Sequence, residues 1–226
     1  MENLQDTLTT MYKNALSKTS FQPIQIRQLL TDSKVFSNVM DYARLLSNNS
    51  TVVYDVEGKP LTFESSSKSV ITSYVDEAMY RKADYVEDVT GDFELQLAEE
   101  IDSLVYNYLK KHSVSAAESA TDLVARITAI KNKFNNKSFV LLVGLKDYLS
   151  IMEKYNGKFP YPVVYCPLIT DSITTDSKIY AIKPKRLYIN ALIDEVNIKK
   201  NVMTGQYIFA LNILNLEVGC DESYFA

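Results

Sequence analysis

The stretch RLYINALI at residues 186–193, together with QYIFALNILNLEV at residues 206–218, decides the fold class of this chain. Both segments are rich in β-branched and aromatic residues with polar residues interleaved, a pattern that is typical of strands. Asp194 and Glu195, and then the segment NVMTG at residues 201–205, carry turn-type residues between them. We therefore expect residues 186–226 to form the closing strands of a sheet, with no chemically equipped site among them.

Helical patterns precede these strands. The clearest covers residues 92–112, where Asp92 can cap the first turn and the basic residues 110–112 suit the last turn. A second helix is expected over residues 121–133, followed by an apolar strand at 138–144 that enters a helix ending near residue 155. Short strands are expected at 163–166 and 178–182, and further helical patterns cover residues 1–18, 24–30 and 35–46. This mixed order predicts an α+β fold.

Residues 51–64 predict a β-hairpin. TVVYDVE alternates apolar and polar residues, Gly58 and Lys59 supply the turn, and PLTFE returns. The following SSSKS at residues 65–69 predicts a flexible polar leash. Because an isolated two-stranded hairpin is at best marginally stable in water, we expect this hairpin to lie on its own chain or on a neighbouring subunit.

Composition narrows the function classes. The 226 residues are 46% hydrophobic and 23% charged, which indicates a soluble globular chain of one or two domains. The net charge of −4 disfavours a protein that binds nucleic acid by neutralising phosphates. We expect neither a signal peptide nor a membrane span. Cys166 and Cys220 are too few for a disulfide framework and are expected to be reduced and partly buried.

The sequence contains few residues in patterns that are typical of catalytic sites. His112 is the only histidine, and its place at a helix end beside lysines favours a surface role over general-base catalysis. VGLK at residues 143–146 lacks the Gly-Lys-Ser/Thr ending of a phosphate loop. The adjacent carboxylates at 99–100, 194–195 and 221–222 diverge and are expected on solvated faces or in intersubunit ion pairs. We therefore expect no catalytic, cofactor-binding or metal-binding residues. The 16 tyrosines fit either a core or a subunit interface.

In this order of parts the chain resembles the major capsid protein of tailed bacteriophages, whose Hong Kong-type fold encapsulins share. The resemblance implies an N-terminal arm at residues 1–30 and a peripheral domain at 31–135, with an extended hairpin loop at about 51–69 and a spine helix at about 92–112. Residues 83–92 resemble the acidic segment that leads into that helix. An axial domain would occupy residues 136–185, and closing strands of both domains residues 186–226. The resemblance implies that the extended loop contacts a neighbouring subunit through Tyr54, Glu57, Gly58, Lys59, Leu61 and Phe63.

The resemblance also implies a structural role and no enzyme activity. Copies of the chain would self-assemble as hexamers and pentamers into an icosahedral head that encloses double-stranded DNA without binding it specifically. A separate scaffolding protein and a portal are the further expected partners, with no membrane and no cofactor. The protein would be assembled in the host cytoplasm and reside in the virion. Alternatives that stay open are an encapsulin-like compartment shell, a phage neck or tail adaptor, and an α/β enzyme.

Overall fold

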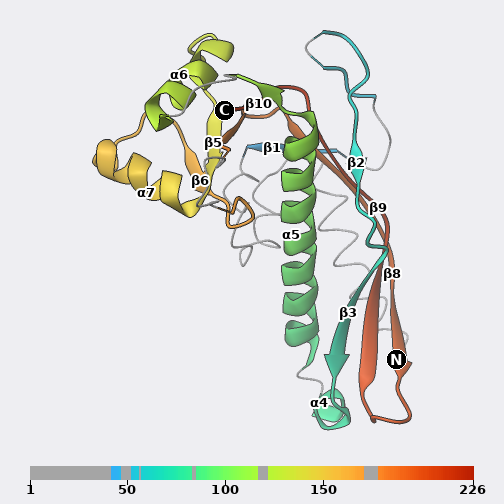
Figure 1. Ribbon diagram of the computed structural model, residues 1–226. Coiled ribbons are helices and arrows are strands. Elements are labelled where there is room, and N and C mark those ends of the chain that lie inside the picture. The colour runs from blue at the N-terminus through green and yellow to red at the C-terminus, as the bar shows by residue number, and fades with distance from the viewer. Residues whose placement is uncertain (1–41, 47–51, 56, 83–84, 117–121, 171–177) are drawn as a thin grey trace.

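The computed structural model describes residues 42–46, 52–55, 57–82, 85–116, 122–170 and 178–226 (Figure 1). The arm expected at residues 1–30, and the helical patterns at 1–18 and 24–30, lie outside these residues. Of the pattern at 35–46, only the end is described. It is a strand, β1 (Ala43–Leu46), so the helix predicted there is wrong at that point.

The first sheet is built on two long strands of 14 residues each, β8 (Leu187–Lys200) and β9 (Tyr207–Cys220), which pair antiparallel. At about 3.3 Å per residue each is about 45 Å long. β1 lies parallel to β8 on one side. β2 (Glu64–Ser65) and β3 (Val70–Val75) both lie antiparallel to β9 on the other side. The two segments quoted at the start of the sequence analysis are therefore the central strands of this sheet.

The turn predicted at residues 194–195 is wrong. β8 continues through both residues to Lys200, and the chain reverses only at residues 201–206. Register shifts between Leu192 and Ile193 and between Ile193 and Val196 absorb the extra residues. A β-bulge of this kind admits polar residues without ending the strand.

The leash predicted at residues 65–69 is also not what the structure shows. The Ser66 backbone N–H donates to the Leu216 carbonyl (2.8 Å), and the Ile213 N–H donates to the Ser69 carbonyl (2.8 Å). The Ser66 hydroxyl also bonds to the Glu100 carboxylate. The segment is held because the edge of β9 offers its backbone groups as partners, whatever the polarity of the side chains.

A long helix, α5 (Tyr85–His112), runs beside this sheet (Figure 1). Its 28 residues make a rod of about 42 Å. The short helix α4 (Glu77–Lys82) precedes it. The start predicted at Asp92 is wrong, because Tyr85 and Val89 extend the buried stripe that continues through Phe93. Asp92 is therefore no N-cap. Its carboxylate accepts a hydrogen bond from the Ser73 hydroxyl of β3 at 2.8 Å, and residues 85–91 are helical rather than a lead-in segment.

The second sheet is formed by short strands in the order β4, β10, β7, β5, β6. Their bounds are β4 (Val114–Ser115), β5 (Val140–Val143), β6 (Val163–Tyr165), β7 (Tyr180–Ile182) and β10 (Ser223–Phe225). The strand β6 lies at one edge, with Pro162 immediately before it and Pro167 two residues after it.

Both faces of the second sheet are covered. The helices α6 (Leu123–Lys133) and α7 (Leu145–Lys154) pack with Leu141 and Val143 of β5, whereas Val140 and Leu142 belong to the larger core that contains α5. All four residues of β5 are buried, which explains the continuous apolar run in the sequence. The main core therefore reaches from the first sheet across α5 to the inner face of the second sheet.

Candidate subunit interface

The predicted hairpin is present and ordered at its tip. Tyr54 and Pro60 form an antiparallel bridge, and the Leu61 N–H donates to the Val53 carbonyl at 2.7 Å. The turn places Gly58 at a φ of 78°, in the left-handed region that glycine adopts without strain. The Asp55 carboxylate accepts from the backbone N–H groups of residues 57 (2.8 Å) and 59 (2.9 Å). The side chain of Asp55 therefore fixes the turn, a role that the sequence prediction missed.

The outer part of the hairpin faces solvent. Val52 is 59% exposed and Tyr54 is 55% exposed, which is high for residues of this size. Glu57, Gly58 and Lys59 are exposed as well, and the Lys59 ammonium lies 2.7 Å from the Glu57 carboxylate. The hairpin thus presents apolar side chains beside charged ones on a fixed turn, which is a composition suited to a protein contact.

The inner part of the hairpin rests on its own chain. Leu61 and Phe63 are half-buried, and their side chains stand about 3 Å from where a Cβ on Gly219 would lie. Gly219 in β9 therefore admits these two side chains because it has none of its own. Of the six residues predicted for the loop contact, Tyr54, Glu57, Gly58 and Lys59 are exposed, while Leu61 and Phe63 fasten the hairpin to β9.

Ion pairs anchor the base of the hairpin to the end of α5. Glu64 in β2 accepts from the Lys111 ammonium (2.6 Å) and lies 2.8 Å from Nε2 of His112. These hydrogen bonds, first that of Lys111 and then that of His112, lower the pKa of Glu64. The His112 ring also lies against Tyr108 one turn earlier. The only histidine of the chain thus helps to position the hairpin, in keeping with the surface role predicted for it.

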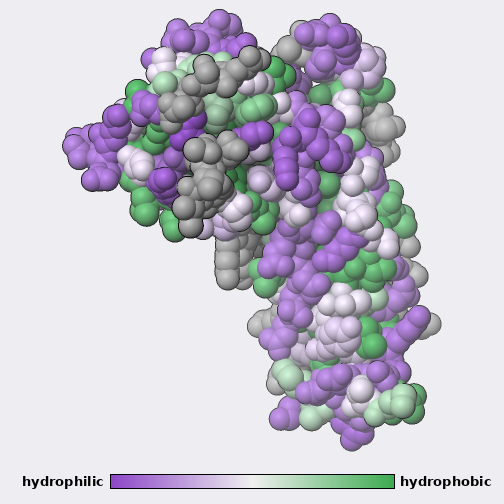
Figure 2. Space-filling model, viewed as in Figure 1, coloured by the Kyte–Doolittle hydropathy of each residue, from purple (hydrophilic) through white to green (hydrophobic). Residues whose placement is uncertain are grey.

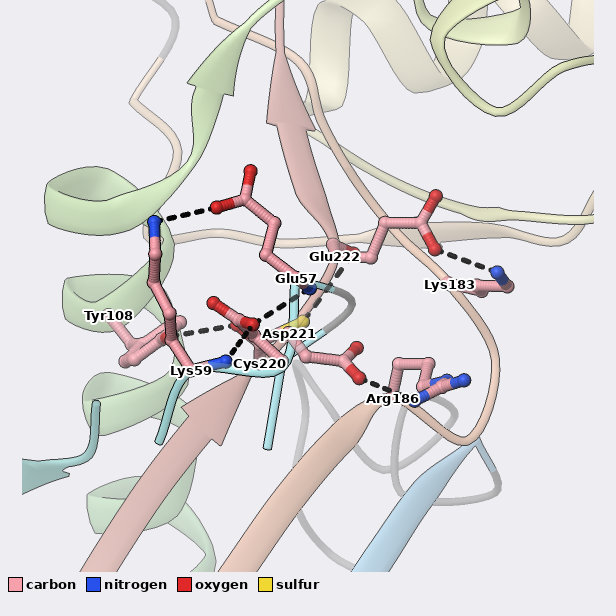
Figure 3. A network of polar contacts seen from close by, with 9 residues as sticks. Glu57, Lys59, Tyr108, Lys183, Arg186, Cys220, Asp221 and Glu222 are labelled. Carbon is pink, nitrogen blue, oxygen red and sulfur yellow. Dashed lines mark hydrogen bonds and ion pairs between the residues drawn. The ribbon is translucent and has the colours of Figure 1, made fainter. Parts of the chain in front are cut away.

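The two sheets are joined where β7 passes into β8 and β9 passes into β10, and polar contacts hold this crossing (Figure 3). Arg186 donates to the Asp221 carboxylate at 2.7 Å, and Lys183 donates to the Glu222 carboxylate at 2.8 Å. The Tyr108 hydroxyl of α5 donates to the Cys220 carbonyl at 2.8 Å. The expectation that residues 221–222 lie on solvated faces or in intersubunit pairs is therefore wrong, because both carboxylates find partners within the chain.

Burial sets the electrostatics of this crossing. The Asp221 side chain is fully buried and its pKa is raised by that burial, although Arg186 acts in the opposite direction. Burial likewise raises the pKa of Tyr108 to about 12, so its hydroxyl stays a neutral donor. At this crossing a buried acid is therefore paired with the guanidinium of Arg186.

The described residues offer little reactive chemistry. Within them no group of three or more His, Cys, Asp or Glu side chains could hold a metal ion. Cys166 and Cys220 are both free and buried, and burial raises the pKa of these thiols to about 11 and about 12. Gly144 is the N-cap residue of α7, in an extended conformation. Across the same residues no helix has the length and apolar character needed to cross a membrane.

Comparison with known proteins gives a likeness in structure alone. No protein-family model matches the chain, and no curated protein matches it. A virus-like particle protein from Pyrococcus furiosus has a similar structure at 11% identity and a TM-score of 0.51, over 92% of this chain and 99% of that one. The chain therefore has an α+β, capsid-like fold. Weaker similarities include Mycobacterium phage Che8, with 13% identity and a TM-score of 0.48 over 73% of this chain and 70% of that one. The satellite phage P4 procapsid matches with 10% identity and a TM-score of 0.47, over 90% and 98%.

Proposed function

We propose that this chain is the major capsid protein of a tailed bacteriophage, with many copies arranged as hexamers and pentamers in an icosahedral head around double-stranded DNA. The observation that carries the proposal is the capsid-like fold, which matches the virus-like particle protein along nearly the whole of both chains. Shell formation is a matter of geometry and requires no catalytic group.

In this proposal the first sheet and α5 form the peripheral domain, and the second sheet with α7 forms the axial domain. The helix α6 falls within the peripheral range of 31–135 expected from the sequence, but it packs with β5 and α7, so we now assign it to the axial domain. The extended hairpin reaches across a neighbouring subunit. Val52 and Tyr54 are exposed in the single chain, and complete burial of a side chain of this kind contributes about 1.5–3 kcal/mol. Because the Asp55 turn and the Glu64 ion pairs already order the hairpin, less conformational entropy is lost when it docks.

One sequence must occupy unequal positions in such a shell. The crossing between the sheets is held by two ion pairs and the Tyr108 hydrogen bond, so the body of the subunit keeps one shape. We assign the required adjustment to the extended hairpin and to the arm at residues 1–30. Hinges that consist of a few loop residues are a common source of such adjustment.

The further partners follow from this role. A separate scaffolding protein would shape the growing shell, and a portal would occupy one vertex. The net charge of −4 suits a shell that encloses DNA without gripping its phosphates. The protein would assemble in the host cytoplasm and reside in the virion. An encapsulin-like compartment shell is the second candidate, favoured by the same likeness to a virus-like particle.

Electron microscopy of the purified chain, with sedimentation to measure particle mass, tests the proposal. Closed shells, hexamers or pentamers are the expected result, and DNA inside particles isolated from infected cells separates a phage head from a protein-filled compartment. A monomer or small dimer that does not assemble with a scaffold or under crowding overturns it.

The role of the hairpin is tested by Val52→Ser, which should raise the concentration needed for assembly. The matched control is Val114→Ser, because Val114 in β4 has nearly the same exposure, 58% against 59%. Equal effects of the two variants would remove the hairpin from the proposal.

A further inference from the structure

The helices α6 and α7 end in the same way, both in sequence and in backbone. Residues 130–137 read IKNKFNNK, and residues 151–158 read IMEKYNGK. In the same positions the two segments share an isoleucine, a lysine, an aromatic residue at the C-cap, an asparagine and a second lysine. We call residues 131–137 and 152–158 the two basic turns.

Both basic turns are closed by the same hydrogen bonds. After α6 the Asn136 N–H donates to the Lys131 carbonyl at 3.0 Å, and after α7 the Gly157 N–H donates to the Met152 carbonyl at 2.9 Å. These bonds are typical of the Schellman motif, in which the residue after the C-cap has a left-handed backbone. The two residues after each C-cap have φ values between 49° and 71°. The chain therefore reverses sharply, and each turn carries one lysine just before the reversal and one just after it.

The basic turns concentrate positive charge at the surface. Their lysines are all exposed: Lys131, Lys133, Lys137, Lys154 and Lys158. The same two segments contain a single carboxylate, that of Glu153. Five cations and one anion give the turns a net charge of +4, and since the whole chain has −4, its other residues together carry −8. The total charge therefore conceals a strongly basic region.

A row of aromatic rings links the two basic turns. Phe134 at the end of α6 stacks on Phe139 with centroids 5.2 Å apart, and Phe139 stacks on Tyr161 at 4.1 Å. Tyr161 meets Phe159 edge to face at 5.7 Å, and Phe159 meets Tyr155 at the end of α7 at 4.9 Å. The two turns therefore belong to one continuous aromatic cluster.

An ion pair also joins the two helices. Arg126 of α6 donates to the Asp147 carboxylate of α7 at 3.1 Å, and both side chains are largely buried. Asp147 is thus paired within the chain and does not offset the exposed lysines. Figure 1 shows α6 and α7 on the same side of the second sheet, and Figure 2 shows hydrophilic side chains at the outer corners of this part of the molecule.

The helix dipole explains only part of this pattern. A cation in the last turn of a helix contributes about 0.3–1 kcal/mol, and the effect falls off beyond that turn. It does not account for Lys137 and Lys158, which follow the reversal, or for the repetition of the pattern at both helix ends. Exposed lysines and asparagine amides are the groups that contact phosphates in nucleic-acid complexes, and three exposed asparagines accompany the lysines: Asn135, Asn136 and Asn156.

We propose that the two basic turns bind the phosphate backbone of double-stranded DNA without sequence preference. A duplex carries a charge about every 1.7 Å along its axis, so it can engage both turns at once, whereas an acidic protein segment needs carboxylates placed to match them. This inference goes beyond the proposed function and applies to the single chain. In a shell it gives the enclosed DNA a weak local contact, while the other residues, with their net charge of −8, repel phosphates.

Fluorescence anisotropy of a labelled duplex of about 30 base pairs tests the binding, at a series of salt concentrations. The expected Kd is about 1–100 µM near physiological salt, as is usual for non-specific binding. If one lysine on each side of both reversals neutralises a phosphate, the logarithm of the binding constant falls against that of the salt concentration with a slope of about −3.6. Binding that is absent, or that does not weaken with salt, overturns the inference.

Neutralising those four lysines should weaken binding about tenfold or more and bring the slope close to zero. The variant carries glutamine at Lys133, Lys137, Lys154 and Lys158. The matched control carries glutamine at four other exposed lysines: Lys59, Lys82, Lys110 and Lys199. Either variant has a net charge of −8, since four cations are removed from a chain of −4. Equal losses in the two variants overturn the inference, because general charge alone would then explain the binding.

The two turns can also be separated. Lys133→Gln with Lys137→Gln, and Lys154→Gln with Lys158→Gln, should each reduce the magnitude of the slope by about half. A full loss from one pair and none from the other overturns the assignment to both turns. Urea unfolding of each variant measures the contribution of the helix dipole separately, since that contribution changes stability and not the salt dependence of binding.

Lysine footprinting needs no variant. The unaltered chain is acetylated with and without the duplex, and modified lysines are identified by mass spectrometry. The duplex should protect Lys133, Lys137, Lys154 and Lys158 and leave Lys82, Lys110 and Lys199 reactive. Protection elsewhere overturns the inference, and so does polyglutamate that displaces the duplex at equal charge concentration, which would assign the turns to an acidic protein segment. Sedimentation of the unaltered chain without DNA scores assembly independently, so a failed shell overturns the proposed function and leaves this result intact.

Discussion

The pair formed by Arg186 and Asp221 offers a sharp test of the crossing between the two sheets. The Asp221 side chain is fully buried, and its Oδ2 atom accepts from Nη1 of Arg186 at 2.7 Å. Its Oδ1 atom has no hydrogen-bond partner among the described residues. Arg186→Met therefore removes the ion-pair partner and the hydrogen-bond donor of a buried carboxylate, which keeps only the weaker influence of Lys183.

Removing one partner of a buried ion pair costs about 3–5 kcal/mol. The Arg186 side chain is 40% exposed, so solvent weakens the pair and the expected loss is smaller, about 2–3 kcal/mol near pH 7. For a chain of this length that loss lowers the Tm by about 4–12 °C. Urea unfolding followed by circular dichroism measures it, since the chain has no tryptophan to report by fluorescence.

The stability loss caused by Arg186→Met should depend on pH in a definite direction. Burial raises the pKa of Asp221, so the folded chain holds this proton more tightly than the unfolded chain. Stability from this group therefore falls as pH rises from the ordinary aspartate range through the folded pKa, and is level above it. Without Arg186 the pKa rises further. The deficit of Arg186→Met should accordingly shrink as the pH is lowered toward the ordinary aspartate range.

Asp221→Asn should cost less, about 1 kcal/mol, because Arg186 can turn to solvent, and combining the two changes should cost less than their sum. Lys59→Met breaks the exposed pair with Glu57 and is the control. It should leave the free energy of unfolding unchanged both near pH 7 and in the ordinary aspartate range. A loss for Arg186→Met below about 0.5 kcal/mol, or one that is equal at both pH values, would refute the reasoning.

Other properties follow from the packing. Gly219→Val should cost about 1–3 kcal/mol, because a Cβ there lies 3.1 Å from the Phe63 ring and the hairpin base must move; unchanged urea unfolding would contradict that contact. Cys166 and Cys220, whose pKa values burial raises to about 11 and about 12, should resist a thiol reagent in the folded chain and react in urea, and rapid labelling of the native protein would disprove their burial. Phe93→Ala removes a fully buried ring and should lower stability by about 3–5 kcal/mol, measured in the same unfolding assay; a loss under about 1 kcal/mol would place that ring outside the core.

Much of the fold could be predicted from local patterns. The strand at 138–144, the helix after it and the long closing strands were all signalled by runs of apolar or β-branched residues, and the structure confirms them as β5, α7, β8 and β9. The errors came where a local signal competed with packing. Asp92 has the chemistry of an N-cap, but the apolar stripe of Tyr85 and Val89 extends α5 past it.

The candidate interface was less accessible to sequence reasoning. The turn at Gly58 has a strong local signature, so the hairpin tip was placed correctly. That Phe63 packs over Gly219 depends on where β9 lies, which no local pattern contains. The Arg186–Asp221 ion pair likewise depends on how distant segments pack, so no local sequence pattern predicts it. Val202 and Met203 did leave a signal, since they are apolar residues inside a turn, where polar residues are the rule.

The edge strand β6 bears on how faithfully copies of the chain would assemble into the proposed shell. It has three residues, with Pro162 before it and Pro167 shortly after, so it offers little backbone for another chain to extend. At this edge of the second sheet, copies that meet at high local concentration are kept from merging into continuous sheets. Their association there is left to side chains and loops, which release more readily than paired strands. In the shell proposed above, a wrongly placed copy could then leave and be replaced, so that errors would be corrected before the shell closes.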